Sequence, residues 1–290
     1  MRCFSAQFLQ VWPSRNYIQK REVKVMYMTD SLEQAEILGV PVTVLGSYNH
    51  AVEIIINRIK QRQKTFCVAV NPIKICHAQS DLKLKQLINS AQMHICDGIG
   101  TAIAGRILYR KKIERITGVQ LFHELITRAE KEELKVFLLG ASQDVNKRAC
   151  ESLLARHPNL QIVGQYCGYF NGNGKVVRMI NSSGTDMLFV AMGSPRQEYW
   201  IAEHIGLVKA SFLMGIGGTL DVVSGNVKWA PRVFRQAGME FIYRLIREPK
   251  RIKQQKVLPK FVWLVLKSRF VNGSSQCRTK SLDIEYSSED

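Results

Sequence analysis

The sequence predicts an α/β fold in which a mainly parallel sheet carries helices on both faces. Short apolar runs alternate along the chain with segments of helical periodicity, a pattern typical of parallel strands joined by helical crossovers. Two runs, "VFLLG" and "MLFVAMG", are apolar throughout, as strands covered on both sides should be. The 290 residues, 46% of them hydrophobic, are enough to bury a large core.

Seven apolar runs are the predicted strands, in chain order Pro41–Leu45, Thr65–Val70, His94–Cys96, Lys135–Gly140, Leu160–Gly164, Met187–Gly193 and Ser211–Gly217. Between most of them, apolar residues recur every three or four positions. These segments are the predicted helices, in chain order Ala51–Lys60, Leu82–Ala91, Val119–Glu132, Gln143–His157 and Gln197–His204. Helices of this length between strands make the expected fold Rossmann-like.

The two ends of the chain differ from this alternation. Residues 1–36 have no clear period and are predicted to form an extension that precedes an α/β core at 37–230. Residues 231–270 are basic and aromatic, with helical spacing that Pro249 and Pro259 interrupt, so we expect a helical appendage there. Residues 271–290 are polar and are predicted to be a disordered tail.

The net charge of +17 is unevenly distributed. The segment from Arg232 to Arg269 contains 11 Lys and Arg against two Glu, a balance of +9. A localised basic segment indicates an anionic partner, which could be a nucleic acid, an acidic membrane surface or a phosphate-bearing substrate. Its basic residues are mixed with Phe261, Trp263 and Leu264, which favours a membrane interface over nucleic acid.

The remaining composition gives no sign of export or of a metal. No run approaches the roughly 18 apolar residues of a membrane span, and the N-terminus lacks the apolar core of a secretion signal, so we expect a cytoplasmic protein. The seven cysteines are scattered without a C-x-x-C pair and are predicted to be free thiols, mostly buried in strands. The six histidines stand singly, so no metal site is expected.

Candidate site residues follow the predicted strands. Ligands of open α/β sheets bind at the carboxyl ends of the strands, where this chain places glycine, amide or carboxylate residues after five strands. In chain order these segments are Asn71-Pro72, Asp97-Gly98, Gly140-Ala141-Ser142, the run from Gly193 to Glu198, and Gly217-Gly218 with Asp221 shortly after. Their shared position predicts a single cleft.

The stretch "HICDGIGTAIAGR" from His94 to Arg106 allows two interpretations. As a dinucleotide-binding loop it lacks the third small residue at Ile103, follows two earlier strand–helix units, and has no acidic residue at the required distance. As a loop that presents Asp97 at a strand end, it offers a carboxylate base, with glycines that leave room for substrate. The second interpretation fits better.

Several motifs resemble the WecG/TagA/CpsF family of bacterial glycosyltransferases. They are "NP" at 71–72, "DGIG" at 97–100, "RITG" at 115–118, "AMGSPRQE" at 191–198, "GIGGTLDVVSGNVKWAP" at 215–231 and "EFIYRLIREPKR" at 240–251. The similarity runs from about Val40 to Val265. It implies an inverting, metal-independent and cofactor-free transfer of an N-acetylmannosamine-type, uronic acid or hexose residue from a UDP-sugar to a polyprenyl-diphosphate-linked acetamido sugar, in surface polysaccharide synthesis.

The resemblance also implies roles for individual residues. Asp97 corresponds to the proposed catalytic base of the family, and Gly98 follows it in the same motif. Asn71 and Gln197 match family residues that line the same pocket, and Asp221 matches a position near the nucleotide. Arg115 and the glycine turns at Gly140, Gly193 and Gly217-Gly218 could neutralise or approach the UDP diphosphate, and Glu198 is a further candidate substrate-binding residue. Arginine and backbone N–H groups are suited to holding the UDP diphosphate without a metal ion.

In the family, the C-terminal segment docks on the membrane and contributes arginines to the active site. Arg244 and Arg251 match two of these arginines, whereas the position of a third is Gln254, and whether Lys253 or Lys256 replaces that arginine stays open. The usual Lys-Arg-Ala-Pro is Lys228-Trp229-Ala230-Pro231 here. Because a lysine does not reproduce the guanidinium fork, the phosphate contacts of this segment differ from the family pattern.

The resemblance therefore places the protein in the cytoplasm, peripherally on the inner face of the bacterial plasma membrane, with an anionic membrane surface and no nucleic acid as partner. The residues alone leave two alternatives, a nucleotide- or NAD-binding oxidoreductase and a basic nucleic-acid-binding protein. The donor sugar, the exact acceptor, a homo-oligomeric state, the true start codon and the role of residues 1–30 stay open.

Overall fold

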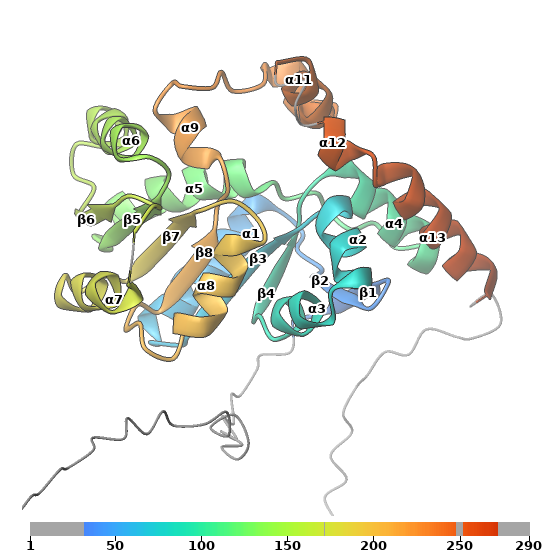
Figure 1. The fold of residues 1–290 in the computed structure, drawn as a ribbon, viewed down its shortest axis with the longest axis horizontal. Coiled ribbons are helices and arrows are strands. Elements are labelled where there is room, and N and C mark those ends of the chain that lie inside the picture. Colours follow the sequence, from blue (N-terminus) through green and yellow to red (C-terminus); the bar gives the residue numbers. More distant parts are fainter. Residues whose placement is uncertain (1–31, 171, 248–251, 272–290) are drawn as a thin grey trace, which may run out of the picture. The chain divides into compact units, whose positions relative to one another are not determined.

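The computed structural model describes residues 32–170, 172–247 and 252–271. Six strands form one sheet in which all neighbours are parallel, in the order β4-β3-β8-β7-β5-β6. The strands are β3 (Thr65–Val70), β4 (Met93–Cys96), β5 (Val136–Gly140), β6 (Ile162–Tyr166), β7 (Met187–Ala191) and β8 (Phe212–Gly215). The predicted α/β fold with a parallel sheet is confirmed (Figure 1).

Every residue of β3, β4, β5, β7 and β8 is buried, which explains why these strands are apolar apart from Thr65 and His94. The edge strand β6 is only partly buried, and it begins two residues after the predicted start at Leu160. Its Gly164 lies under the ring of Phe137, where a Cβ atom would come within 2.4 Å of the ring. Glycine is therefore needed there for the close packing of β6 on β5.

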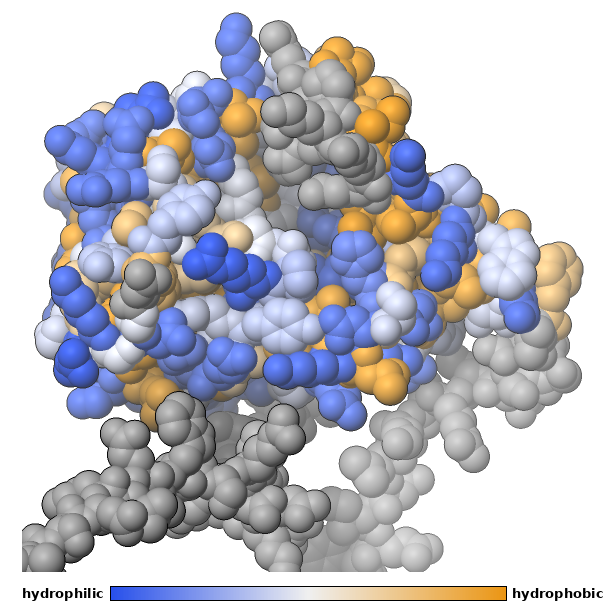
Figure 2. Space-filling model, viewed as in Figure 1, coloured by the Kyte–Doolittle hydropathy of each residue, from blue (hydrophilic) through white to orange (hydrophobic). Residues whose placement is uncertain are grey.

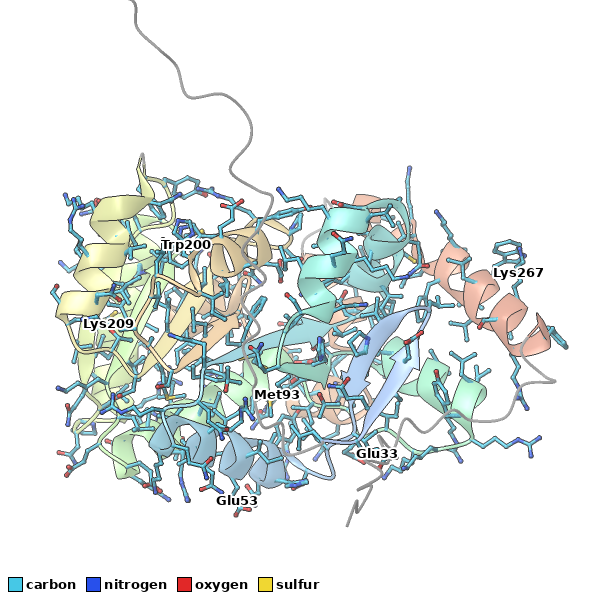
Figure 3. The ribbon with its side chains drawn as sticks, turned by 90° about the horizontal axis from the view of Figure 1, so that it is seen from below. Glu33, Glu53, Met93, Trp200, Lys209 and Lys267 are labelled. Atoms are coloured by element: carbon cyan, nitrogen blue, oxygen red, sulfur yellow. The ribbon has the colours of Figure 1, made fainter. Side chains whose placement is uncertain are left out.

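Helices cover both faces of the sheet. On one face α1 (Tyr48–Lys60) packs against α5 (Gly118–Lys131), and on the other α3 (Leu82–Asn89) packs against α8 (Arg196–His204). Trp200 of α8 and Glu53 of α1 mark these opposite faces in Figure 3. The remaining helices of the core are α2 (Pro72–Ser80), α4 (Ile99–Tyr109), α6 (Gln143–Arg156), α7 (Asn173–Ser182) and α9 (Thr219–Val223).

The first predicted strand belongs to a separate hairpin. Pro41–Leu45 corresponds to β2 (Val40–Thr43), which pairs antiparallel with β1 (Gln34–Ile37) outside the large sheet. Leu38 and Gly39 form the two-residue turn, both with positive φ, as the tightest hairpin turns require. Leucine is an unusual residue for that conformation, so the turn gave no sequence signal. β1 begins at Gln34, within the segment predicted as an extension.

Four helices of the core were not predicted: α2, α4 as a complete helix, α7 and the short α9. In α2 the buried face includes Lys74, a charged residue that interrupts the apolar period. The start of α2 is nevertheless well defined, because the Asn71 side chain accepts a hydrogen bond from the backbone N–H of Lys74. Pro72 occupies the first helical position, where its missing N–H costs no hydrogen bond.

In its described residues, the predicted helical appendage contains α10 (Arg232–Gln236), α11 (Glu240–Arg247), α12 (Ile252–Gln255) and α13 (Leu258–Val271). Pro259 lies in the first turn of α13 and does not interrupt it. α13 packs on α2 and α4 through the buried side chains of Phe261 and Val265. Pro249, most of the predicted extension (residues 1–31) and residues 272–290 of the predicted tail lie outside the described residues.

The described cysteines are free thiols, as predicted. Cys67 and Cys96 are buried in strands, whereas Cys76 and Cys150 are buried in helices and Cys167 is partly exposed. Burial raises the pKa of the Cys67 and Cys96 thiols to about 12, so both stay protonated at neutral pH. Within the described ranges, every helix is too short or too polar to cross a bilayer.

Candidate active site

The predicted site residues lie at one edge of the sheet. Asp97 follows β4, Asn71 follows β3, Gly217 follows β8, Gly193 follows β7, and Gly140 ends β5. These five strands are consecutive neighbours in the sheet, and all of them are parallel. Residues that are up to 146 positions apart in the chain therefore share one edge, as the sequence predicted.

Asp97 is half-buried where β4 ends. Its backbone N–H donates to the carbonyl of Val70 at 2.9 Å, which continues the pairing of β4 with β3. One carboxylate oxygen accepts from the N–H of Gly118 at 3.3 Å. Gly118 is the first residue of α5, so the carboxylate lies at a helix N-terminus, where backbone N–H groups favour negative charge. The contact orients the carboxylate.

The glycines after Asp97 shape the turn into α4. Gly98 has φ near +95°, a conformation that other residues rarely adopt. A Cβ atom on Gly100 would lie 2.7 Å from the ring of Pro72, so this glycine lets α4 pack closely on α2. The space at Gly100 is thus occupied by Pro72 and not by substrate, contrary to our interpretation of that residue. The loop presents Asp97 at the end of β4, which agrees with the interpretation that the sequence favoured.

Tyr48, which the sequence analysis did not identify, lies close to Asp97. Its hydroxyl oxygen accepts from the Thr117 backbone N–H at 2.9 Å and lies 3.2 Å from the Thr117 hydroxyl. Burial raises the pKa of Tyr48, and the charge of Asp97 adds to this, against opposing contributions from Thr117 and Arg115. Tyr48 is the first residue of α1, and no local pattern indicates its approach to residues 69 positions later.

Arg115 joins the core to the appendage. One guanidinium nitrogen donates to the backbone carbonyl of Arg235, and another lies 3.7 Å from the carboxylate of Glu240. Both partners belong to the segment predicted as the appendage. The Arg115 side chain is 20% exposed. The predicted role in diphosphate binding stays a prediction, and the structure adds a direct contact between this arginine and α10 and α11.

The segment that enters the appendage is held by a stack of three side chains. The ring of His123 stacks on Trp229 at 4.7 Å, and the Arg235 guanidinium lies 4.1 Å over the same indole. Arg235 also donates to the side-chain oxygen of Gln120 at 3.3 Å. Burial lowers the pKa of His123 to about 4, and the nearby positive charges of Arg156, His157 and Arg235 add to this. Trp229, which departs from the family pattern, therefore fastens the appendage to α5.

Gln197 and Glu198 are nearly inaccessible. Gln197 is 3% exposed, and its side-chain oxygen accepts from the Gly217 N–H at 2.9 Å. Glu198 is 1% exposed and forms an ion pair with Lys74 at 2.7 Å. Lys74 was not singled out from the sequence. Their predicted role as substrate-binding residues stays untested, and the structure shows both engaged with protein groups.

The predicted glycines fall into two groups. Gly140 has φ near +129°, and a Cβ atom there would meet the Ala191 carbonyl oxygen at 2.3 Å, so glycine is required by strand packing. Gly193 and Gly217 also have positive φ, but a Cβ atom on either would meet no atom within 4 Å. These two, with the exposed Gly218, leave backbone open to an incoming ligand at the ends of β7 and β8.

Comparison with known proteins identifies the family. The sequence profile of the glycosyl transferase WecG/TagA/CpsF family matches residues 35–275. The chain belongs to this family. A relative from Bacillus spizizenii, named N-acetylglucosaminyldiphosphoundecaprenol N-acetyl-beta-D-mannosaminyltransferase, is 33% identical over 209 residues, 72% of this chain and 81% of the relative. The protein is thus a glycosyltransferase, and the oxidoreductase and nucleic-acid-binding alternatives are set aside.

The glycosyltransferase carries two further candidates at the β8 and β6 ends. Asp221, in α9, accepts from the Asn226 side chain at 3.1 Å and stays partly exposed. Tyr169, which sequence reasoning missed, is 74% exposed in the loop after β6. The guanidinium of Arg196 lies 6.0 Å over the Tyr169 ring and donates to the Gly168 carbonyl at 2.8 Å. An exposed aromatic ring and a carboxylate are groups that recognise a nucleobase.

The appendage arginines are only partly described. Arg244 lies in α11, and nothing of its side chain is described, while Arg251 lies outside the described residues. Their predicted phosphate contacts stay predictions. Among the described residues, no cluster of three or more His, Cys, Asp or Glu side chains has the arrangement of a metal site.

Proposed function

We propose that this glycosyltransferase moves an N-acetylmannosamine-type sugar, or a uronic acid or hexose, from a UDP-sugar to a lipid-diphosphate-linked acetamido sugar. The product would serve surface polysaccharide synthesis. The name of the Bacillus relative, which joins a mannosaminyl group to a lipid-diphosphate acceptor, supports the acceptor class. The observation that carries the proposal is the half-buried carboxylate of Asp97 at the sheet edge, beside the open glycine turns.

The reaction is a single displacement at the anomeric carbon. The acceptor hydroxyl attacks that carbon from the face opposite the diphosphate, the bond to the diphosphate oxygen breaks, and UDP leaves. Asp97 takes the hydroxyl proton as the new glycosidic bond forms. One displacement inverts the anomeric configuration. The hydrogen bond from Gly118 to one oxygen holds the carboxylate while the other accepts the proton.

We place the donor along the ends of β7 and β8. Gly193, Gly217 and Gly218 form open turns where a diphosphate would lie, and backbone N–H groups of such turns bind phosphate oxygens; the Gly217 N–H itself is donated to Gln197, so Gly217 would contribute space and not that donor. Tyr169 and Asp221 are the proposed contacts of the nucleotide, and Asn71 would hold hydroxyl groups of the sugar. Because no strand end carries an Asp-x-Asp pair, Arg115, Arg244 and Arg251 would balance the diphosphate charge without a divalent ion.

We propose that residues 231–270 form an appendage to a core at 37–230 and hold it peripherally on the inner face of the plasma membrane. Apolar residues gather where α11 and α13 lie (Figure 2). The exposed ones in these helices include Phe241, Ile246, Trp263, Leu266 and Phe270. The positive balance of the segment would add attraction to anionic lipid, at about 1 kcal/mol per basic residue near the surface.

The test is product formation from purified substrates. The protein would be incubated with lipid-diphosphate-N-acetylglucosamine and a panel of UDP-sugars, and products would be detected by mass. We expect one added sugar from at least one donor, with inverted configuration by NMR. Absence of product with every UDP-sugar, in a preparation that melts cooperatively, would refute the proposed donor class.

A further inference from the structure

Lys74 and Glu198 form a buried ion pair whose role in the site is not evident from either residue alone. The Lys74 nitrogen lies 2.7 Å from one carboxylate oxygen of Glu198, and the two side chains are 4% and 2% exposed. In the other ion pairs found among the described residues, both side chains are at least 13% exposed. Charges removed from water are costly unless paired, so this pair constrains both of its helices.

The position of the pair in the fold is specific. Lys74 lies in α2, which follows β3, and Glu198 lies in α8, which follows β7. In the sheet, β8 lies between β3 and β7. The ion pair therefore joins the elements on either side of β8, near its carboxyl end.

A chain of hydrogen bonds continues from the pair to the loop after β8. The Gln197 amide nitrogen donates to the same oxygen of Glu198 at 3.0 Å. The Gln197 amide oxygen accepts from the Gly217 N–H at 2.9 Å. A carboxylate only accepts hydrogen bonds, so the amide nitrogen must face Glu198 and the oxygen must face Gly217. The ionised carboxylate thus determines which way the Gln197 amide points.

The surroundings leave Gln197 little freedom. A Cβ atom on Gly215, the last residue of β8, would lie 2.5 Å from the Gln197 amide nitrogen. Gly217 differs, since it has positive φ and open space on its Cβ side. Burial favours a raised pKa of Glu198, but Lys74, Gln197 and Ser194 outweigh it and hold that pKa below its usual value. Glu198 is therefore a carboxylate at neutral pH.

We propose that Lys74 is a positioning residue of the transferase: through Glu198 and Gln197 it fixes the glycine turn at Gly217 that receives the donor diphosphate. Gln197 and Glu198 then act on the substrate only through that turn, and neither binds the sugar. The inference rests on the proposed function, because it assigns the turn to a UDP-sugar. It applies to the donor and not to the acceptor.

The test variant is Lys74→Met combined with Glu198→Gln. It removes both charges, so the net charge of the site is unchanged and no unpaired charge is buried. A glutamine at 198 can present either its oxygen or its nitrogen to Gln197, so the orientation of that amide is no longer fixed. We expect the UDP Kd and the donor KM to rise about tenfold, while the acceptor KM changes by less than about twofold.

The matched control is Lys60→Met with Glu132→Gln. This pair has the same 2.7 Å separation but lies at the C-terminal ends of α1 and α5, away from the glycine turns. We expect its UDP Kd and both KM values to equal those of the unmodified protein. Calorimetric titration with UDP gives the Kd, and steady-state assays give the two KM values.

A second variant, Gln197→Met, keeps the ion pair and removes both hydrogen bonds of the amide. It tests the inference even if the first variant fails to fold, and we expect the same rise in UDP Kd. Combining it with the Lys74 and Glu198 substitutions should add no further loss, because residues acting through one contact are not additive. Losses that multiply, or a UDP Kd unchanged in either variant, would overturn the inference. An unmodified protein that does not bind UDP would instead overturn the donor assignment.

Discussion

Two helices of equal length, α5 and α13, differ in the kind of side chain that they leave on their outer side. Each has 14 residues. α5 buries one apolar face against the sheet and exposes polar residues on the other; its buried residues are Val119, Leu121, Phe122, Leu125, Ile126 and Ala129. α13 buries Phe261 and Val265 against α2 and α4, yet its outer side exposes further large apolar residues, Val262, Trp263, Leu266 and Phe270.

The difference indicates two surroundings within one chain. A helix whose outer side is polar is complete in water, as α5 is. A helix that exposes large apolar residues on its outer side needs a second apolar environment. The lysine at the far part of α13, Lys267, lies 5.0 Å over the Trp263 ring, so charge and apolar surface occur together (Figure 3). This combination is typical of a helix at a membrane interface.

The largest effect should come from the core, where we place the chemistry. Asp97→Asn keeps the shape of the side chain and removes its basicity, so turnover should fall about 10²–10⁴-fold, with UDP affinity unchanged. Asp144→Asn, on the exposed surface of α6, is the control and should leave turnover intact. Near-full turnover of Asp97→Asn would make Asp97 a structural turn residue.

The next prediction compares how much a leucine in α5 and a leucine in α13 contribute to the free energy of unfolding. Leu125→Ala in α5 removes a fully buried side chain and should lower the free energy of unfolding by about 2–5 kcal/mol. Leu266→Ala in α13 removes a side chain that is 43% exposed and should change it by less than about 0.5 kcal/mol. Denaturant unfolding measures both. Equal losses would mean that α13 is part of the core.

A third change removes the apolar side of α13. The double variant Trp263→Ser and Leu266→Ser should weaken binding to vesicles with anionic lipid by about tenfold or more, because both side chains leave the membrane interface. Leu82→Ser with Leu207→Ser, two exposed leucines outside the appendage, is the control. Co-sedimentation at several salt concentrations gives the affinities. Equal binding by the two variants would count against α13 as the anchor.

Much of this contrast could be predicted from the sequence. The run Thr65–Val70 coincides with β3 because every position is buried and all but Thr65 are apolar, and Asp97 stands out because a charged residue follows such a buried run. The basic and aromatic character of the appendage is equally plain in the order of its residues. In each case the signal lies within a few adjacent residues.

The rest depends on contacts between distant residues. Lys74 meets Glu198 across 124 positions, and Tyr48 meets Thr117 across 69, so no local pattern indicates either pair. The buried Lys74 also hid α2 from the sequence analysis, because its charge interrupts the apolar period of the helix. A Cβ atom on Gly217 would meet open space, whereas one on Gly140 would meet the Ala191 carbonyl oxygen, and this difference depends on atoms that only the fold brings close.

A smaller effect concerns the dependence of folding stability on pH. Burial lowers the pKa of both His94, in β4, and His123, under the appendage, to about 4, against about 6.5 when exposed. Between pH 6.5 and 4 the unfolded chain binds more protons, so stability should fall as the pH falls through this range and be flat above it. His123→Phe, which keeps a ring on Trp229, should reduce that slope in thermal melts from pH 7 to 5. An unchanged slope would show that His123 does not contribute.

The last prediction is that removal of divalent metal ions does not change turnover. Chelation with EDTA should leave turnover unchanged, because arginines and backbone N–H groups are proposed to hold the diphosphate. An assay with and without EDTA, at constant ionic strength, measures this. Activity lost in EDTA and restored by Mg²⁺ or Mn²⁺, but not by added salt, would contradict the prediction.

Contacts among α2, α4 and α13 fix the distance between α13 and the candidate site. Gly100 of α4 packs against Pro72 of α2 and, at 3.9 Å from its Cβ position, against Phe261 of α13. α4 begins two residues after Asp97, so α13 and the loop that carries Asp97 are held at a constant separation. With α13 docked on a membrane as we propose, a lipid acceptor anchored in the bilayer would offer its hydroxyl at only one distance from its lipid. The enzyme would measure the length of the acceptor, accepting one sugar on the diphosphate and rejecting two.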